Sequence, residues 1–335
     1  MRAECDLPAP DIEPLVKAAF SLIRSRRFGE ARKVLERIER LDAADPFGTH
    51  AQIHLHIDEG SLEEGVERAI AYLTMNDPFD GINVHNTMHL ASLLMELGRA
   101  GASIEWQERV MVPSAPGQPM SYPGVVSVLW QTEVFGFGRS SGRVLPWRKL
   151  APTAPIASHL RLDVSEMIVR IIPLIALSDD ANVDALLATL TDPAATAEGL
   201  PSGERVHAVR SVSAGLRAWW RGDARVAATQ LGEALPALSR LTDYPGQFAA
   251  IEDTLIDAEW HSGGRVHSER ILRDRVGAYA QPRPRDQFWL GRILASTGRP
   301  TEGRDLLASA RLRWVGADDN SPELRMLDSL TVLGR

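Results

Sequence analysis

The sequence predicts an all-α protein, a tetratricopeptide-like α-solenoid of stacked helical hairpins with a Pro/Gly-rich irregular middle. Three observations lead to this fold class. Apolar residues recur with helical periodicity along most of the 335 residues, and few runs alternate with the period of two that a strand requires. Short turns separate successive amphipathic segments, as in helical hairpins. Equivalent hairpin positions, Phe28 and Leu62, lie 34 residues apart, which is the tetratricopeptide period.

The N-terminal part predicts three helical hairpins in succession. Their helices are expected over residues 13–27 and 28–41, 47–60 and 61–74, and 83–99 and 102–111. Ser61 is followed three residues later by Glu64, which predicts a capping box at the start of a helix. A turn is expected at Ala100–Gly101. Such hairpins bury their apolar faces only by stacking on one another, which is why they predict a solenoid.

The middle of the chain interrupts this rhythm. Residues 112–124 and 135–155 are rich in proline and glycine and are expected to form loops, with one short helix, 125–135, between them. A connector between two helical stacks is the simpler interpretation, and a lid over a binding site is the alternative.

Three further units follow, and each is expected to form a helix, a glycine-containing turn and a second helix. They cover residues 215–241, 254–280 and 289–312. The chain is therefore predicted to be a single helical-repeat domain, 1–335. Its sub-regions are the N-terminal repeats 12–112, the loop-rich middle 113–158 and the C-terminal repeats 159–335.

Composition excludes several classes of protein. The chain is 44% hydrophobic and 24% charged with a net charge of −7, and its basic residues are scattered, which argues against nucleic-acid binding. The most apolar run, 167–177, is too short to cross a bilayer and contains Arg170 and Pro173. The N-terminal stretch lacks an apolar signal sequence, and Cys5 is the single cysteine. These features predict a cytoplasmic protein, and the preference for arginine over lysine is typical of GC-rich bacteria.

Residues 54–59, HLHIDE, differ by one residue from the HxHxDH run that holds two metals in some metallohydrolases. That interpretation fails because the segment is predicted to be helical and because Glu59 takes the place of the third histidine. In a helix, His50 and His54 lie on one face, whereas His56 points elsewhere.

A second pair with the same spacing, His85 and His89, follows 35 residues after His50 and His54. The two pairs are therefore expected at equivalent positions on adjacent first helices, which line the concave side of such arrays. Four imidazoles converging there would suit a divalent transition metal such as zinc, iron, copper or nickel. Two alternatives stay open, namely acid–base catalysis by His54 and His89 without a metal, and histidines that merely pack.

The chain also resembles the tetratricopeptide repeat protein 38 family. The resemblance rests on residues 50–65, 83–99, 128–136 (VLWQTEVFG) and 251–258 (IEDTLIDA), and covers about residues 45–300. It implies a tetratricopeptide-like α-solenoid and no defined activity. Where the family tends to have polar residues before the EDTLIDA-like helix, this chain has Pro245, Phe248 and Ala249, and it has Ser165 where a histidine is common. These departures imply a more apolar groove and a specialised ligand.

Ligand-binding candidates outside the metal site follow from their position in these segments. Trp130 and Trp147 flank the irregular middle and are candidate walls of an apolar pocket. Glu133, Gln247 and Glu252 are added as polar candidates, and His50 and His85 are expected to contact the ligand as well.

The sequence is therefore compatible with three functions. The first is binding of a protein, a peptide or a small apolar molecule in a concave groove centred on His50, His54, His85 and His89. The second is a small-molecule enzyme of bacterial secondary metabolism that uses the same histidines. The third is a structural scaffold or homo-oligomer in which these side chains only pack.

Overall fold

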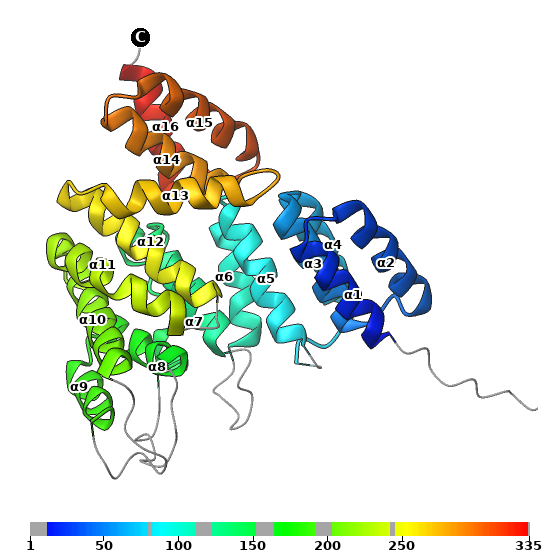
Figure 1. The fold of residues 1–335 in the computed structure, drawn as a ribbon, viewed down its shortest axis with the longest axis horizontal. Helices are drawn as coiled ribbons and strands as arrows, with labels where there is room; N and C mark the ends of the chain where they lie inside the picture. The colour runs from blue at the N-terminus through cyan, green and yellow to red at the C-terminus, as the bar shows by residue number, and fades with distance from the viewer. Residues whose placement is uncertain are drawn as a thin grey trace, which may run out of the picture.

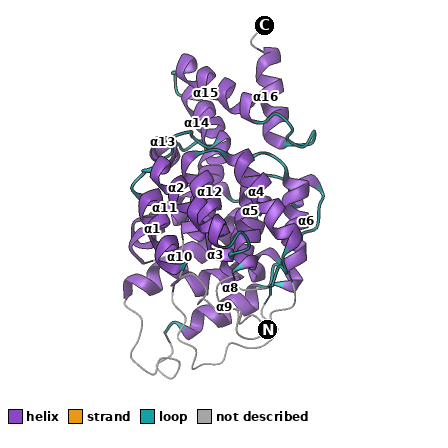
Figure 2. Ribbon diagram, turned by 90° about the vertical axis from the view of Figure 1, so that its right-hand side faces the viewer, coloured by secondary structure: helices purple, strands orange, loops and turns teal. Residues whose placement is uncertain are grey.

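The computed structural model describes residues 12–79, 82–111, 122–151, 164–191, 203–241 and 245–333. Within these ranges the chain forms sixteen α-helices and two short 3-10 helices and contains no strand (Figure 2). Consecutive helices pack against each other as hairpins. The predicted all-α helical-repeat fold is confirmed. Among the described residues, none of the helices combines the length and the apolar character needed to cross a bilayer.

The N-terminal hairpins begin and end close to the predicted residues. They are α1 (Glu13–Arg24) with α2 (Phe28–Leu41), α3 (Pro46–Glu59) with α4 (Leu62–Met75), and α5 (Asn83–Glu96) with α6 (Ala100–Val110). The first helices of the hairpins, α1, α3 and α5, pack side by side. HLHIDE lies inside α3, which confirms the helical interpretation.

Local chemistry explains where α3 starts and stops. Pro46 stands in its first turn, where the missing N–H is not needed, and Asp45 caps the helix by accepting from the Gly48 N–H at 2.5 Å. Gly60 ends the helix in the left-handed conformation, φ 88°, which a residue with a Cβ adopts only at a cost.

Two local predictions in this part are wrong. Ser61 precedes α4 as expected, but its side chain caps no backbone N–H and instead contacts His56 Nδ1 at 2.8 Å. A nearby ring nitrogen has therefore replaced the helix terminus as its partner. The turn between α5 and α6 lies over Leu97–Arg99, with Gly98 at φ 72°, so that Ala100 and Gly101 belong to α6.

The middle contains α7 (Tyr122–Val134), η1 (Arg139–Ser141) and η2 (Trp147–Lys149). The short helix expected at 125–135 is thus present and begins three residues earlier. Residues 112–121 and 152–155 of the predicted loops lie outside the described residues. Helix α7 packs against α5, α8 and α12, so the middle helix connects the N-terminal and C-terminal helices.

The remaining helices complete the chain as an arc around α7 (Figure 1). They are α8 (Val164–Ala176), α9 (Asp180–Thr189), α10 (Gly203–Trp220), α11 (Ala224–Leu241), α12 (Pro245–Ser262), α13 (Val266–Ala278), α14 (Pro284–Ser296), α15 (Pro300–Arg313) and α16 (Pro322–Leu333). The three predicted glycine turns occur at Gly222, Gly263 and Gly298, each with φ 85°.

The C-terminal helices also return to the first half of the chain. The Gln281 N–H donates to the Glu59 carbonyl at 3.2 Å, and Trp314 Nε1 donates to the Glu96 carbonyl at 2.8 Å. Arg313 Nη2 donates to the Gly60 carbonyl at 2.6 Å. The loop between α13 and α14 and the end of α15 therefore contact the C-terminal ends of α3 and α5 (Figure 1). This closure holds the first helices in place from a second side.

Candidate metal centre

The four predicted histidines come from two neighbouring helices. His50 and His54 stand one turn apart on α3, and His85 and His89 stand one turn apart on α5. Because α3 packs directly against α5, the two pairs face each other across the helix–helix contact. Phe20 of α1 covers the α3 pair, with its ring 5.2 Å from the His50 ring and 5.3 Å from the His54 ring. All four histidines are half-buried.

The ring nitrogens converge on one region. His89 Nε2 lies 2.9 Å from His85 Nε2 and 3.2 Å from His50 Nε2. One nitrogen from each of the four rings lies within 4.8 Å of the corresponding nitrogens of the others. Zinc bound tetrahedrally at about 2.0–2.1 Å requires nitrogens roughly 3.3–3.4 Å apart. The 3.2 Å separation is close to that value, the 2.9 Å separation is shorter, and the other nitrogens lie within 4.8 Å of one another.

Burial keeps these imidazoles neutral. It lowers the pKa of His50 to about 2, aided by the His54 and His85 rings, and lowers the pKa of His54 to about 4, aided by His85. Burial also lowers the pKa of His85, and it holds the pKa of His89 well below its usual value. At neutral pH each ring therefore keeps an unprotonated nitrogen, which is the form that binds a metal.

The contacts at His89 are poorly explained as ordinary hydrogen bonds. A neutral imidazole has one N–H and one acceptor nitrogen. His89 Nε2 meets two other Nε2 atoms, so either one proton or one lone pair has to serve both contacts. His85 Nδ1 is also buried and lacks a hydrogen-bond partner in the described part of the chain. A cation between the Nε2 atoms would instead use every lone pair that points at it.

Nearby carboxylates do not join this group. Asp58 is half-buried, and burial raises its pKa, while Glu59 forms an ion pair with Arg32. Asp77 accepts from the Phe79 N–H at 2.9 Å, and Asp80 lies outside the described residues. In the described ranges, the candidate donor set consists of the four imidazoles alone.

The tryptophans predicted to wall a pocket are core residues. Trp130 is fully buried and donates from Nε1 to Thr254 Oγ1 at 2.9 Å. Trp147 is 4% exposed and donates from Nε1 to Glu133 Oε1 at 3.0 Å. Hydrogen bonds deep in the protein satisfy both indole N–H groups, and both rings pack within the hydrophobic core. Glu133 is engaged in the same way and also accepts from the Arg139 N–H at 2.6 Å.

Glu252, a polar candidate on α12, has a partner outside the histidine cluster. Glu252 pairs with Arg275 at 2.6 Å, and Arg275 also pairs with Asp253 at 2.6 Å and with Asp286 at 3.3 Å. Glu252 thus belongs to a buried network of ion pairs between α12, α13 and α14. Gln247 lies in α12, and its side chain is outside the described residues.

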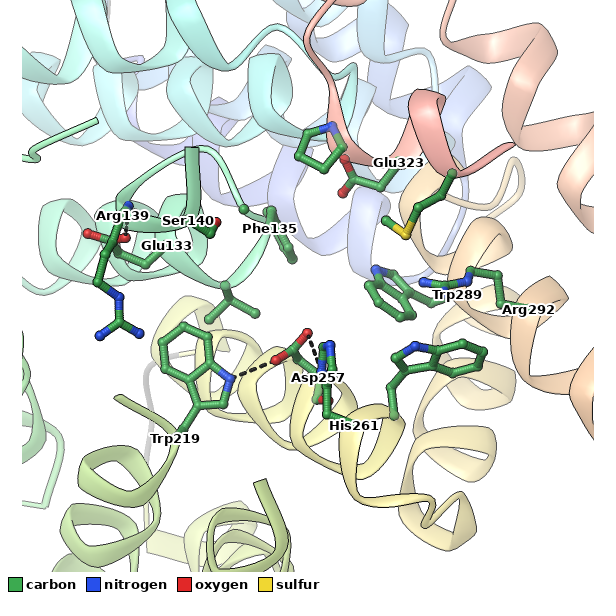
Figure 3. Close-up of a pocket in the computed structure, with 15 residues that line it drawn as sticks. Glu133, Phe135, Arg139, Ser140, Trp219, Asp257, His261, Trp289, Arg292 and Glu323 are labelled. Carbon is green, nitrogen blue, oxygen red and sulfur yellow. Dashed lines mark hydrogen bonds and ion pairs between the residues drawn. The ribbon is translucent and has the colours of Figure 1, made fainter. Parts of the chain in front are cut away.

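Sequence reasoning missed two features. The first is Phe20, which covers the histidines. In the sequence it is visible as an apolar position on the neighbouring first helix. A cavity near the C-terminal helices was also missed; Trp219, Asp257, Trp289 and Arg292 help to line it (Figure 3). These residues come from three helices, α10, α12 and α14, that no short motif connects. None of the four histidines lines this cavity.

A scan of protein-family models finds no match to the chain, and a search of curated proteins finds none either. The geometry of the site is therefore the guide to its function.

Proposed function

We propose that this helical-repeat protein binds one divalent transition-metal ion, zinc foremost, through His50, His54, His85 and His89. The observation that carries the proposal is the convergence of four neutral imidazoles, with Nε2 atoms 2.9 Å and 3.2 Å apart at its centre. Imidazole nitrogen is a favoured ligand of zinc, copper, iron and nickel. Metal sites inside helical proteins are built from side chains on facing helices, as the two pairs are here.

The same pKa shifts count against acid–base catalysis by these histidines without a metal. A general acid or base works best when its pKa lies near the working pH. His50, with a pKa of about 2, and His54, with a pKa of about 4, would stay neutral and weakly basic throughout the physiological range. A weak proton affinity is no obstacle to metal binding, because protons then do not compete for the nitrogen.

Partial exposure supports a role beyond holding α3 against α5. A structural zinc site is normally closed, whereas a catalytic or ligand-binding site keeps one position within reach of solvent. All four histidines keep part of their surface exposed, so the cluster lies near the surface of the protein. This favours a second candidate function, in which the bound metal takes up a small ligand or substrate as an additional ligand.

Cobalt substitution tests both candidates. Metal-free protein without a histidine tag should develop strong visible absorption bands with one equivalent of Co²⁺, because tetrahedral Co²⁺ absorbs far more than the hydrated ion. His54→Ala and His89→Ala should abolish or redistribute the bands. His56→Gln is the matched control: His56 is on the same helix but contacts Ser61 instead of the cluster. Unchanged spectra in the His89→Ala protein would refute the proposal.

A shift of the cobalt bands on addition of azide would show an open position and support the second candidate. Bands that stay unchanged with azide would indicate a closed site that only joins α3 to α5.

A further inference from the structure

A cavity of about 340 Å³ lies between the middle of the chain and the C-terminal helices (Figure 3). Its lining comes from α7, η1, α10, α12, α14 and α16, and includes the three indoles of Trp219, Trp260 and Trp289. Trp260 and Trp289 meet edge to face, with centroids 5.9 Å apart. The volume is at the lower end of the range for small-molecule sites, about 300–1,000 Å³, so it suits a molecule with one or two rings.

Arg292 gives this aromatic cavity a cation that forms no ion pair in the described part of the chain, although Asp257 and Glu323 are near enough to raise its pKa. Its guanidinium lies 3.9 Å from the Trp260 ring centroid and 4.8 Å from that of Trp289. Its Nη1 is buried and has no hydrogen-bond partner in the described ranges. Burial and the nearby Arg265 lower the pKa of Arg292 to about 10, so the group is still charged at neutral pH. A buried donor of a charged group is costly to leave without a hydrogen bond.

The carboxylates of the lining are already engaged. Asp257 accepts from Trp219 Nε1 at 2.7 Å and lies 3.4 Å from His261 Nδ1 (Figure 3). Glu133 accepts from Trp147 and from the Arg139 N–H. Each of these acids is held by a donor of its own.

The third carboxylate, Glu323, pairs with Arg285 at 2.8 Å, where both side chains are almost fully buried. Elsewhere in the lining, the hydrogen bond to the Asp257 side chain raises the pKa of His261. An incoming anion would therefore meet a guanidinium nitrogen of Arg292 that has no partner in the described residues, while the lining carboxylates already accept hydrogen bonds from donors of the protein.

We propose that this cavity binds a small aromatic carboxylate. Its carboxylate would accept from Arg292, and its ring would pack among the indoles of Trp219 and Trp289. A planar guanidinium matches a carboxylate in a two-point contact, and an aromatic ring gains edge or face contacts with indole. The site is separate from the histidine cluster and needs no metal.

Fluorine NMR provides the test, with 4-(trifluoromethyl)benzoate as the probe and 4-(trifluoromethyl)benzamide as its neutral partner of equal shape. The full chain is treated with a chelator first, so that no metal at the histidines can hold the carboxylate. The benzoate signal should shift or broaden with saturation, and the benzamide should bind at least about tenfold more weakly, because it lacks the charge.

Variants then locate the binding. Arg292→Gln should weaken benzoate binding by about tenfold or more. Arg292→Lys should weaken it less, because lysine keeps the charge but cannot make the two-point contact of a guanidinium with a carboxylate. Arg304→Gln is the matched control, since Arg304 is an exposed arginine on the neighbouring helix α15. Ser140→Trp fills the exposed rim of the cavity and should block binding while leaving Arg292 in place. This variant keeps the test decisive if the Arg292 variants do not fold.

Three outcomes would overturn the proposal. They are the absence of saturable benzoate binding to the wild-type chain, equal affinity for the benzamide, and undiminished binding in a folded Arg292→Gln or Ser140→Trp protein. Acetate is the last probe: acetate that competes as strongly as the benzoate would show an anion site without an aromatic subsite, which also contradicts the proposal.

Discussion

Acidification should destabilise the metal-free protein through its buried histidines. Unfolded, His50 and His54 titrate near the ordinary pKa of about 6.5, whereas in the fold their pKa values are about 2 and about 4. The unfolded chain therefore binds more protons below pH 6.5, and stability falls as the pH decreases from there toward the folded pKa values. Above pH 6.5 both states carry neutral rings, and this contribution no longer changes.

The magnitude follows from about 1.4 kcal/mol for each pH unit and each histidine. Between pH 6.5 and 5 this gives about 2 kcal/mol for each ring, or about 4 kcal/mol for His50 and His54 together. The figure is an upper limit because both rings keep some contact with water, which screens the shift.

Urea unfolding with a chelator at pH 7 and pH 5 measures this effect. Burial also raises the pKa of acids such as Glu96 and Asp286, so the wild-type chain is compared with the His50→Gln/His54→Gln variant, which keeps those acids. The free energy of unfolding should fall by up to about 4 kcal/mol more in the wild-type chain. Equal losses in both proteins would refute the account of the histidine pKa values.

Two further predictions concern the C-terminal helices. Gly303→Ala should destabilise the protein by about 1–3 kcal/mol, because a Cβ at this position would lie 2.6 Å from the Gly291 carbonyl oxygen. Gly277 has open space around it, so Gly277→Ala should be neutral or stabilising. Thermal unfolding compares the two, and equal effects would contradict the proposed close contact of α14 and α15. Arg285→Met should cost about 3–5 kcal/mol by leaving Glu323 buried without its partner, and a loss below about 1 kcal/mol in urea would contradict this.

Helical periodicity predicted most of the fold because each hairpin depends on local contacts. The bounds of α2, expected over 28–41, agree with the structure, and the 35-residue offset between the histidine pairs correctly indicated that they would face each other. A repeat fixes which residues of neighbouring helices are equivalent, so the approximate position of a side chain on α5 follows from its counterpart on α3.

Contacts between distant segments could not be predicted in this way. The Trp314 hydrogen bond to the Glu96 carbonyl joins residues that no repeat relates. Trp130 and Trp147 are residues of the type that line pockets, but their N–H groups donate to buried acceptors. Those acceptors, Thr254 and Glu133, are brought to the indoles only by the folding of the chain. That Arg292 forms no ion pair within the described ranges is likewise a property of the packed structure, since the sequence does not show which acids are already engaged.

The histidine cluster is tested most directly by the zinc content of the protein. Tag-free protein is incubated with excess Zn²⁺, freed of unbound metal and analysed by mass spectrometry beside the His54→Ala/His89→Ala and His56→Gln variants. We predict about one zinc for each chain in the wild-type and His56→Gln proteins, and a near-complete loss in the double variant, which lacks two of the four imidazoles. Zinc absent from the wild-type chain, or retained in a folded double variant, would contradict the assignment of a metal site to these four residues.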